Sequence, residues 1–541
     1  MVRSFARWAA VLLLLAAPAR AQTEAAPAQG PILVTFDLHM DPMGTDPERG
    51  RELYRSWLTA AEWLLGVVEP RGAKLSFSTV GQFAEFSLED RERSFPIVRR
   101  LYESGGSVGT HSHTWVREEA FRWTDVTHRA ALADSRRVWA DDVGMVDRLV
   151  AAVFDLDDPT AIRGINNLRG THLPGPAADR QALFAEYGFR VSQAGPGEDF
   201  VAYFDHYMYH PFRPSSENEL AEDRRGPVVL TQAGPVLGQV GVHKGVEQDM
   251  SLPRIQARFL GEVLCWLHDL RTGAPERVWC FGWGSHGSDV VPRGVSRRWV
   301  EPALDWFDAH FAGRRIGGAV VARYSSYAEE AELYEAWEKA HPDLPSRCYP
   351  ERTREWAKYP WLVPVAAYLW GATYVEALRS DETVQIHRLE APEELGGPYP
   401  IVVVLPAGAG DVTVDLSAVD PGEWTAIDPA SGERREHAAA SVAIPASGAI
   451  LVPGSSRATL ADQEKKIDQA FPPVRPGADG GRPRPGRRDL MDLDADGDGK
   501  VSREEFPGPD RVFRQIDADG NGSIDPEEAK NAPPPPGEKD R

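Results

Sequence analysis

Two copies of one short acidic pattern near the C-terminus constrain this chain more than any other feature of its sequence. The first copy runs from Asp494 to Glu505 and the second from Asp517 to Glu528. Each has oxygen-bearing side chains at its first, third and fifth positions, a glycine at the sixth and a glutamate at the twelfth. This spacing predicts a calcium-binding loop, because Ca²⁺ takes about six to eight oxygen ligands and the glycine permits the sharp turn.

The two loops predict two calcium sites. Side-chain oxygens or a backbone carbonyl serve as ligands at alternate loop positions and at the twelfth. Val501 and Ile524, at the eighth position of each loop, are expected to pair in a short ribbon, so residues 489–531 resemble a helical EF-hand pair. A merely solvated acidic tail explains the charge but not the repeated glycine and glutamate. The predicted ligand positions are Asp494, Asp496, Asp498, Lys500, Ser502 and Glu505, then Asp517, Asp519, Asn521, Ser523, Asp525 and Glu528.

The chain is long enough for several domains and has the composition of a folded protein. Its 541 residues exceed the usual size of one domain, and 42% of them are hydrophobic. The formal net charge is −21. This charge disfavours nucleic acid or an anionic membrane surface as a partner, because both are themselves negatively charged.

The N-terminus has the pattern of an export signal. Arg3 and Arg7 precede an apolar run at residues 9–17, and a small-x-small cleavage pattern ends at Ala21. The run is shorter than the roughly 20 apolar residues of a membrane-spanning helix, and no later segment approaches that length. We therefore expect a signal peptide at residues 1–21, cleavage after Ala21 and a secreted or periplasmic protein. A retained membrane anchor is the alternative.

The first half of the chain alternates between strand patterns and helical patterns. An apolar run typical of a buried strand occurs at residues 32–36, further strands are predicted at 74–79 and 107–110, and helical patterns lie between them. Strands separated by helices form parallel sheets with crossover helices. The alternation continues, so residues 30–345 are predicted to form a distorted β/α barrel, closed or nearly closed.

The sequence pattern changes in the second half of the chain. Short β-rich runs separated by Gly, Pro and Asp turns predict a small all-β sandwich at residues 374–456. Residues 471–488 are rich in Pro, Gly and Arg, and residues 462–488 are predicted to be a flexible linker. The EF-hand pair follows, and the proline run near the end predicts a disordered tail at residues 532–541.

Charged and imidazole side chains gather where two of the predicted strands end. Asp37, His39 and Asp41 alternate along the first strand end, and His111 and His113 along the third. Side chains two apart on a strand point the same way, and a barrel places such strand ends at one mouth. Two imidazoles and a carboxylate suit a catalytic Zn²⁺ or a similar divalent transition metal. The alternative is that these histidines are loop residues without a ligand.

Several segments in the same order resemble the polysaccharide deacetylase family of carbohydrate esterases. The first family motif has the form Thr-Phe-Asp-Asp-Gly, and Thr35-Phe36-Asp37 matches its first three residues. The resemblance covers roughly residues 30–330 and implies a metal-dependent hydrolase that removes N- or O-acetyl groups from glycans. The other segments that carry it are residues 75–84, 104–112, 168–175, 183–191 and 279–286.

The chain departs from the family pattern at two ligand positions. Leu38 stands where the motif has its second aspartate, and Trp115 where a later histidine is expected. These losses mean either an inactive site or a rearranged one. In a rearranged site His113 replaces the missing histidine, and His39 or Asp41 replaces the aspartate.

The resemblance also implies roles for three residues. Asp37 would act as the general base and His286 would protonate the leaving amine. Arg169 would orient the base or stabilise developing charge. The alternatives are a structural salt bridge for Arg169 and a plain turn at His286.

The implied partner is a glycan, and aromatic side chains could provide faces on which sugar rings stack. Two other functions stay open: a non-catalytic glycan-binding module with a degenerate site, and a calcium-dependent surface or scaffold protein that contacts a cell-surface partner through its EF-hand pair. Core packing explains the aromatic residues equally well. The aromatic residues considered for sugar stacking are Trp115, Tyr203, Phe204, Tyr207, Tyr209, Phe212, Trp279 and Trp283.

Overall fold

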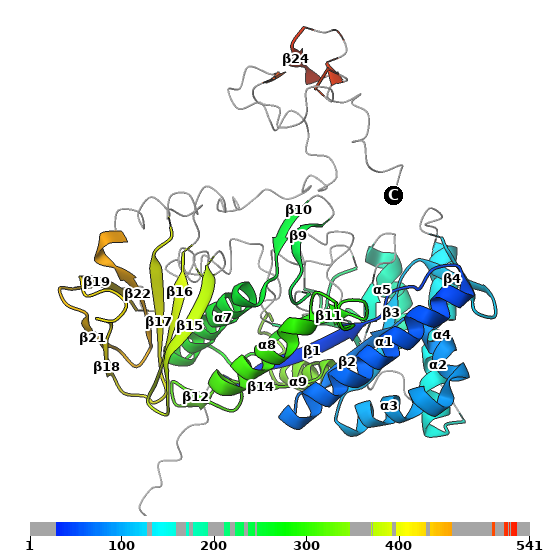
Figure 1. Cartoon of the computed structure of the whole chain (residues 1–541), viewed down its shortest axis with the longest axis horizontal. Helices are drawn as coiled ribbons and strands as arrows, with labels where there is room; N and C mark the ends of the chain where they lie inside the picture. Colours follow the sequence, from blue (N-terminus) through cyan, green and yellow to red (C-terminus); the bar gives the residue numbers. More distant parts are fainter. Residues whose placement is uncertain are drawn as a thin grey trace, which may run out of the picture. The chain divides into compact units, whose positions relative to one another are not determined.

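The chain divides into two compact units, Met1–Pro473 and Val474–Arg541. The computed structural model describes part of each unit (Figure 1). The described residues are 29–126, 132–157, 169–171, 177–192, 210–216, 222–231, 236–243, 246–346, 369, 372–391, 397–428, 433–456, 500–503, 513, 514, 516, 517, 519, 521–526 and 528.

A parallel sheet forms the centre of the larger unit. Its order is β11-β1-β2-β3-β6, and β14 pairs with the first half of β1. Every side chain of β1 before its last residue is buried, as expected for a strand covered on both faces. The parallel α/β architecture predicted from the sequence is confirmed. The strands are β1 (Ile32–His39), β2 (Leu75–Thr79), β3 (Ser107–Ser112), β6 (Arg169–Thr171), β11 (Trp279–His286) and β14 (Ala322–Tyr324).

Closure of this sheet into a barrel is not seen. In the described part of the chain β11 and β6 are the two ends of the sheet, and no ladder joins them. The remaining strands up to residue 320 form short two-stranded ribbons. They are β4 (Trp115–Glu119) with β5 (Arg122–Asp125), β7 (Val191–Ser192) with β8 (Val229–Leu230), β9 (Val240–His243) with β10 (Val246–Asp249), and β12 (Arg315–Ile316) with β13 (Ala319–Val320).

Amphipathic helices supply much of the core around the sheet. Asp46 caps the first of them by accepting a hydrogen bond from the Glu48 backbone N–H at 3.0 Å, and Pro47 occupies its first position. Helix α4 packs against β3 and α2. The helices are α1 (Pro47–Val68), α2 (Gly81–Glu89), α3 (Arg91–Glu103), α4 (Leu132–Phe154), α5 (Ala177–Glu186), α7 (Leu252–Thr272), α8 (Arg297–His310) and α9 (Tyr327–Ala340), with a 3₁₀ turn at Glu69–Arg71.

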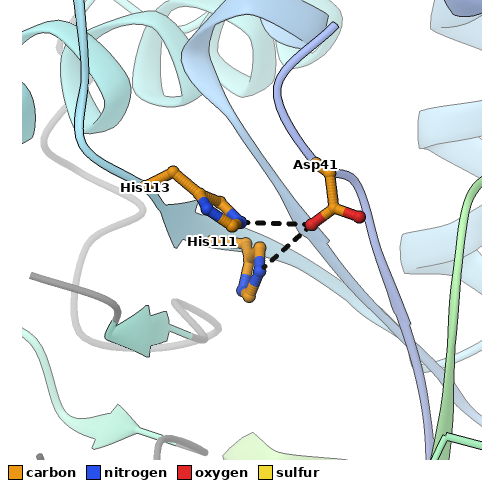
Figure 2. Close-up of side chains that lie close together, drawn as sticks. All are labelled: Asp41, His111 and His113. Atoms are coloured by element: carbon orange, nitrogen blue, oxygen red, sulfur yellow. Dashed lines mark hydrogen bonds and ion pairs between the residues drawn. The ribbon is translucent and has the colours of Figure 1, made fainter. Parts of the chain in front are cut away.

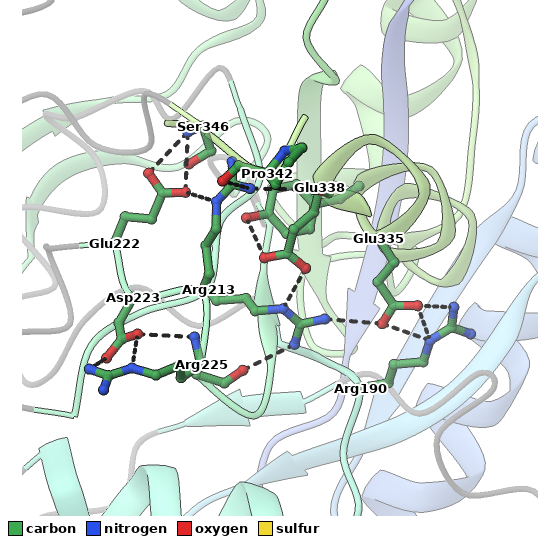
Figure 3. A network of polar contacts seen from close by, with 12 residues as sticks. Arg190, Arg213, Glu222, Asp223, Arg225, Glu335, Glu338, Pro342 and Ser346 are labelled. Carbon is green, nitrogen blue, oxygen red and sulfur yellow. Dashed lines mark hydrogen bonds and ion pairs between the residues drawn. The ribbon is translucent and has the colours of Figure 1, made fainter. Parts of the chain in front are cut away.

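A network of ion pairs fastens the chain around β7 and β8 to α9 (Figure 3). Arg190 donates to the Glu335 carboxylate at 2.6 Å, and Arg213 donates to Glu338 at 3.0 Å. Arg224 donates to backbone carbonyls just beyond the end of α9. Arg224 also donates to the Glu338 carbonyl at 3.3 Å, in the last turn of α9, where carbonyls lack a partner within the helix. The network therefore has a structural role.

An antiparallel sheet completes the larger unit. Its order is β15-β16-β17-β22-β19-β20, and β18 pairs with β21, which confirms the predicted antiparallel strands. The strands are β15 (Thr373–Ser380), β16 (Val384–Glu390), β17 (Pro400–Pro406), β18 (Val412–Asp415), β19 (Trp424–Ile427), β20 (Arg434–His437), β21 (Ser441–Ile444) and β22 (Ala449–Pro453), followed by a 3₁₀ turn at Gly454–Ser456.

Strand β17 joins two cores because its alternate residues face opposite sides. Val402 and Val404 pack in a core with residues of β18 and β21. Val403 and Leu405 belong to the core that also contains the parallel sheet and α7. Figure 1 shows β15 beside α7, and the two elements are in contact. The antiparallel sheet therefore shares a hydrophobic core with the parallel sheet.

In the smaller unit the predicted ribbon is confirmed. Strands β23 (Val501–Ser502) and β24 (Ser523–Ile524) pair antiparallel, with Val501 opposite Ile524. Both of these side chains are fully buried.

Three predicted segments lie outside the described residues. They are the signal peptide at residues 1–21, the linker at 462–488 and the tail at 532–541. Among the helices that the structure describes, none combines the length and the apolar character needed to cross a membrane.

The β4–β5 hairpin follows His113 directly and is held by one buried carboxylate. Glu85 of α2 accepts hydrogen bonds from Arg117 Nε at 2.8 Å and from Trp123 Nε1 at 2.9 Å. It also accepts one from the backbone N–H of Phe121 at 3.1 Å. This carboxylate fixes the chain that leads away from the candidate site.

We predict that Glu85→Ala lowers the free energy of unfolding by about 2–3 kcal/mol, because it leaves buried donors without an acceptor. Glu89→Ala, one turn later on α2, should cost less than about 0.5 kcal/mol, since Glu89 forms an exposed ion pair with Arg51. Chemical denaturation of both variants measures the difference. Equal losses would show that the buried carboxylate does not hold the hairpin.

Candidate metal centre

The parallel strands bring most of the predicted site residues to one edge of the sheet. Strands β1 and β11 pair along their whole length, so His39 lies opposite His286. His111 is on β3, two strands from β1, and His113 follows the end of β3. Asp41 lies just past the end of β1. Residues far apart in the sequence therefore meet at the carboxyl ends of three strands.

Asp41, His111 and His113 form a three-residue cluster (Figure 2). Asp41 Oδ1 lies 3.1 Å from His113 Nε2 and 3.8 Å from His111 Nε2. One potential ligand atom from each residue lies within 4.8 Å of the others. His111 is buried, and Asp41 and His113 are half-buried. Two imidazole nitrogens and a carboxylate oxygen fit Zn²⁺ or a similar ion and leave a coordination position open.

The charge of Asp41 is stabilised by its neighbours. Burial by itself would raise the pKa of Asp41. The hydrogen bond with His113 and the charges of His286, His113 and His39 outweigh this effect and hold the pKa well below its ordinary value. The carboxylate is therefore ionised and available to a cation.

His39 contacts a different carboxylate. Its Nδ1 lies 2.9 Å from Asp37 Oδ2, and the Ser78 hydroxyl donates to Asp37 Oδ1 at 3.1 Å. The Asp37 side chain is only 1% exposed. The sequence left His39 and Asp41 as alternative replacements for the missing aspartate. Among the described residues, Asp41 is the one that clusters with His111 and His113.

His286 is on β11, so it lies on the side of His39 that faces away from β2 and β3. Its ring centre is 4.2 Å from that of His39, and its Nε2 is 4.0 Å from Asp41 Oδ2. Its Nδ1 contacts Asp289 Oδ2 at 2.7 Å. Burial lowers the pKa of His286, but the hydrogen bond with Asp289 and the charges of Asp41, Asp289 and Asp37 raise it above the ordinary value overall.

The structure places Arg169 on β6, with Thr110 of β3 as its backbone neighbour. The side chain of Arg169 lies outside the described residues, so its predicted role stays a prediction. Leu38 is fully buried in the core because it faces away from Asp37 and His39 on β1. Trp115 begins β4 and packs against the same core.

Sequence reasoning missed two residues that contact the candidate site. Ser78 follows the strand pattern of β2 and faces Asp37, and Asp289 lies three residues after His286. Nearness in the sequence to His286 was a signal for Asp289, whereas Ser78 is 41 residues from Asp37 and had no such signal. Of the aromatic residues considered for sugar stacking, Phe212, Trp279 and Trp283 are buried. The four tyrosine and phenylalanine residues between 203 and 209 lie outside the described residues.

The second calcium loop has a partly formed ligand cluster. Oxygens of Asp517, Asp519 and Glu528 lie within 4.8 Å of one another. Asn521 and Gly522 donate backbone hydrogen bonds to the two oxygens of Asp517, each at 3.0 Å. The structure thus brings together carboxylates that repel one another until a cation is bound.

The remaining calcium-loop residues are described only in part. Ser523 donates to Asn521, and the Asp525 and Glu528 side chains each accept a backbone hydrogen bond from the other residue. Lys500 directly precedes β23, and Ser502 is the last residue of that strand. The predicted first-loop ligands that fall outside the described residues are Asp494, Asp496, Asp498 and Glu505.

Comparison with known proteins identifies the calcium loops. The family model described as EF hand matches residues 488–506 and 510–530. These segments are a small part of the chain, so they support calcium binding without assigning a family to the whole protein. No curated protein matches the chain.

Solved structures similar to the chain include proteins reported as polysaccharide deacetylases. One from Mycobacterium smegmatis is 14% identical, with 58% of this chain and 95% of that chain covered and a TM-score of 0.35. One from Pseudomonas aeruginosa PAO1 is 13% identical, covering 58% and 93%, with a TM-score of 0.34. A glycoside hydrolase/deacetylase from Parabacteroides distasonis is 10% identical, covering 70% and 82%, with a TM-score of 0.34.

These neighbours include the family that the sequence motifs resemble. Identities and scores this low carry no argument about substrate or activity.

We predict that replacing His111 and His113 together by alanine abolishes binding of a transition metal, because one carboxylate remains of the three clustered ligands. Metal analysis after removal of calcium measures the stoichiometry. The control is His341→Ala, because His341 lies just beyond the end of α9 and is not in the cluster. An unchanged stoichiometry in the double variant would contradict the assignment.

Proposed function

We propose that the larger unit is a metal-dependent hydrolase that removes N- or O-acetyl groups from glycans. The observation that carries the proposal is the meeting of Asp41, His111 and His113 with two carboxylate–imidazole pairs at one edge of the sheet. The three clustered residues would hold a zinc-type ion. When bound, such an ion polarises a carbonyl group and lowers the pKa of a water molecule.

The residues around the cluster suit hydrolysis. Proton transfer during amide hydrolysis needs an acceptor for the proton of the water and a donor for the leaving amine. The Asp37–His39 pair offers an acceptor, and the family resemblance assigns that role to Asp37. His286 offers a donor at Nε2, the ring nitrogen that faces the cluster, 4.0 Å from Asp41 Oδ2. Asp289 holds Nδ1 of this ring, which directs Nε2 toward Asp41.

The barrel fold and the domain boundaries are part of the same proposal. Strand β6 contacts β7, and β7 pairs in parallel with β8. Val236 forms a parallel bridge with Gly284 of β11. These segments support a distorted barrel over residues 30–345 that closes between β6 and β11. We likewise propose the all-β domain at 374–456 and the EF-hand pair at 489–531.

We propose that the protein is exported by means of residues 1–21. Calcium loops work at the millimolar calcium concentrations found outside cells, and a glycan substrate would be accessible there. The EF-hand pair would then stabilise the protein or dock it on a cell-surface partner.

A non-catalytic glycan-binding or calcium-dependent scaffold protein is the second candidate. The observation that favours it is the burial of Leu38, an apolar side chain at a position where the family motif has a ligand. The two candidates differ in their transition-metal content and in their activity. Only the hydrolase requires both a bound transition metal and catalytic activity.

We predict that the protein, depleted of calcium and loaded with zinc, releases acetate from acetylated glucosamine oligomers or acetylated xylan. Asp41→Ala should lose the metal and at least about 100-fold in rate, because it removes the anionic ligand. Acetate release and metal content are measured on the same samples. A fully loaded protein that releases no acetate from either class of substrate would exclude the hydrolase.

We predict that deletion of all residues after Asp462 leaves hydrolysis nearly unchanged. The deleted part includes the whole smaller unit, Val474–Arg541, and the parallel and antiparallel sheets lie before it. Rates of the full and shortened chains are compared with and without calcium. An intact protein that is active only with calcium, together with an inactive shortened chain, would make the EF-hand pair a regulator instead.

A further inference from the structure

Asp37 is poorly placed to take a proton from a water molecule directly. Its side chain is only 1% exposed, and both carboxylate oxygens are engaged inside the protein. Oδ1 accepts from Ser78 at 3.1 Å, and Oδ2 contacts His39 Nδ1 at 2.9 Å. A general base must lie within hydrogen-bonding distance of the proton that it removes. The Asp37 carboxylate is therefore covered at the edge of the sheet, where a water molecule would approach.

His39 covers Asp37 and has one ring nitrogen left for another partner. A carboxylate can only accept hydrogen bonds, so the proton of the neutral imidazole is on Nδ1 and Nε2 is the unprotonated nitrogen. The His39 side chain is 14% exposed. Its ring centre is 4.7 Å from that of His111 and 4.2 Å from that of His286. The ring therefore lies between the metal cluster and the proposed proton donor.

The sequence makes this arrangement particular to the chain. The motif that Thr35-Phe36-Asp37 resembles ends in glycine, and His39 stands at that glycine position. A glycine would leave the Asp37 carboxylate uncovered. Here an imidazole is inserted between the carboxylate and the reaction site.

We propose that His39 Nε2 is the proton acceptor of this site and that Asp37 is a positioning residue that fixes the His39 tautomer. This inference rests on the proposed hydrolase function. A buried carboxylate that orients an imidazole base is a recurring arrangement in hydrolases with unrelated folds. The base is then His39 in place of Asp37, which lies two residues earlier on the same face of β1.

The reaction balances with the residues present. A water oxygen bonds to the acetyl carbonyl carbon while one water proton moves to His39 Nε2, and the carbonyl electron pair moves to its oxygen. When this pair returns, the bond between carbon and nitrogen breaks, and the amine takes a proton from His286. The products are acetic acid and the free amine. The proton on His39 returns to His286 through solvent.

His39 is distinct from the proposed metal ligands. The cluster within the described residues comprises Asp41, His111 and His113, and the Nδ1 atom of His39 is occupied by Asp37. Replacing His39 should therefore separate proton transfer from metal binding.

The first experiment compares His39→Gln with Asp37→Asn in the full-length, zinc-loaded protein. We expect His39→Gln to keep the zinc content and KM but to lower kcat by about 100-fold or more. Asp37→Asn should lower kcat by at least as much, because an amide can stabilise the wrong tautomer. His341→Gln serves as the control, and thermal unfolding confirms that each variant is folded.

Two results would overturn the inference. One is a His39→Gln variant whose kcat falls less than threefold while Asp37→Asn is inactive, since Asp37 would then be the base itself. The other is loss of zinc from His39→Gln, which would make His39 a ligand. Failure of the hydrolase proposal is a different result, because it appears as an inactive zinc-loaded wild type.

Nitrogen NMR of the histidine rings provides a readout that does not need activity. We expect the neutral His39 ring of the wild type to carry its proton on Nδ1, and Asp37→Asn to shift the proton toward Nε2. A wild-type ring protonated on Nε2 would overturn the assignment even in an active enzyme.

Discussion

The pairing of β1 with its two neighbours in the parallel sheet holds the candidate site together. Strand β11 fixes His39 opposite His286, and β2 places Ser78 opposite His39, from where its hydroxyl donates to Asp37. The backbone hydrogen bonds of these ladders set the positions before any side chain at the edge makes a contact. A shift of one residue in β1 would exchange its two faces, so that Leu38 would take the place of Asp37 and His39 and these two would enter the apolar core.

The site also depends on balanced charge in a partly buried place. Burying an isolated carboxylate is costly, so each one near the edge has a partner. Asp37 contacts Ser78 and His39, Asp41 contacts His113, and Asp289 contacts His286. These contacts orient the imidazole rings as well as satisfying the carboxylates. Leu38, on the opposite face of β1, packs in the apolar core.

The sequence predicted the parallel strands and the residues at their ends because spacing along a strand determines which side chains share a face. It did not distinguish Asp41 from His39 as the residue clustered with the histidines. That choice depends on how the chain turns after β1 ends and on the neighbouring strands. Strand β15 was not predicted, because its largely polar, exposed residues lack a buried-strand pattern. Asp289 was missed because only the turn after β11 brings it back to His286.

The position of a bound metal ion tests the central claim most directly. Anomalous diffraction at the zinc absorption edge, from crystals of the full chain soaked with zinc, locates the ion independently of activity. We predict a peak about 2.0–2.2 Å from an Asp41 carboxylate oxygen and from one imidazole nitrogen each of His111 and His113. A peak coordinated by His39 without Asp41, or no peak at this edge of the sheet, would contradict it.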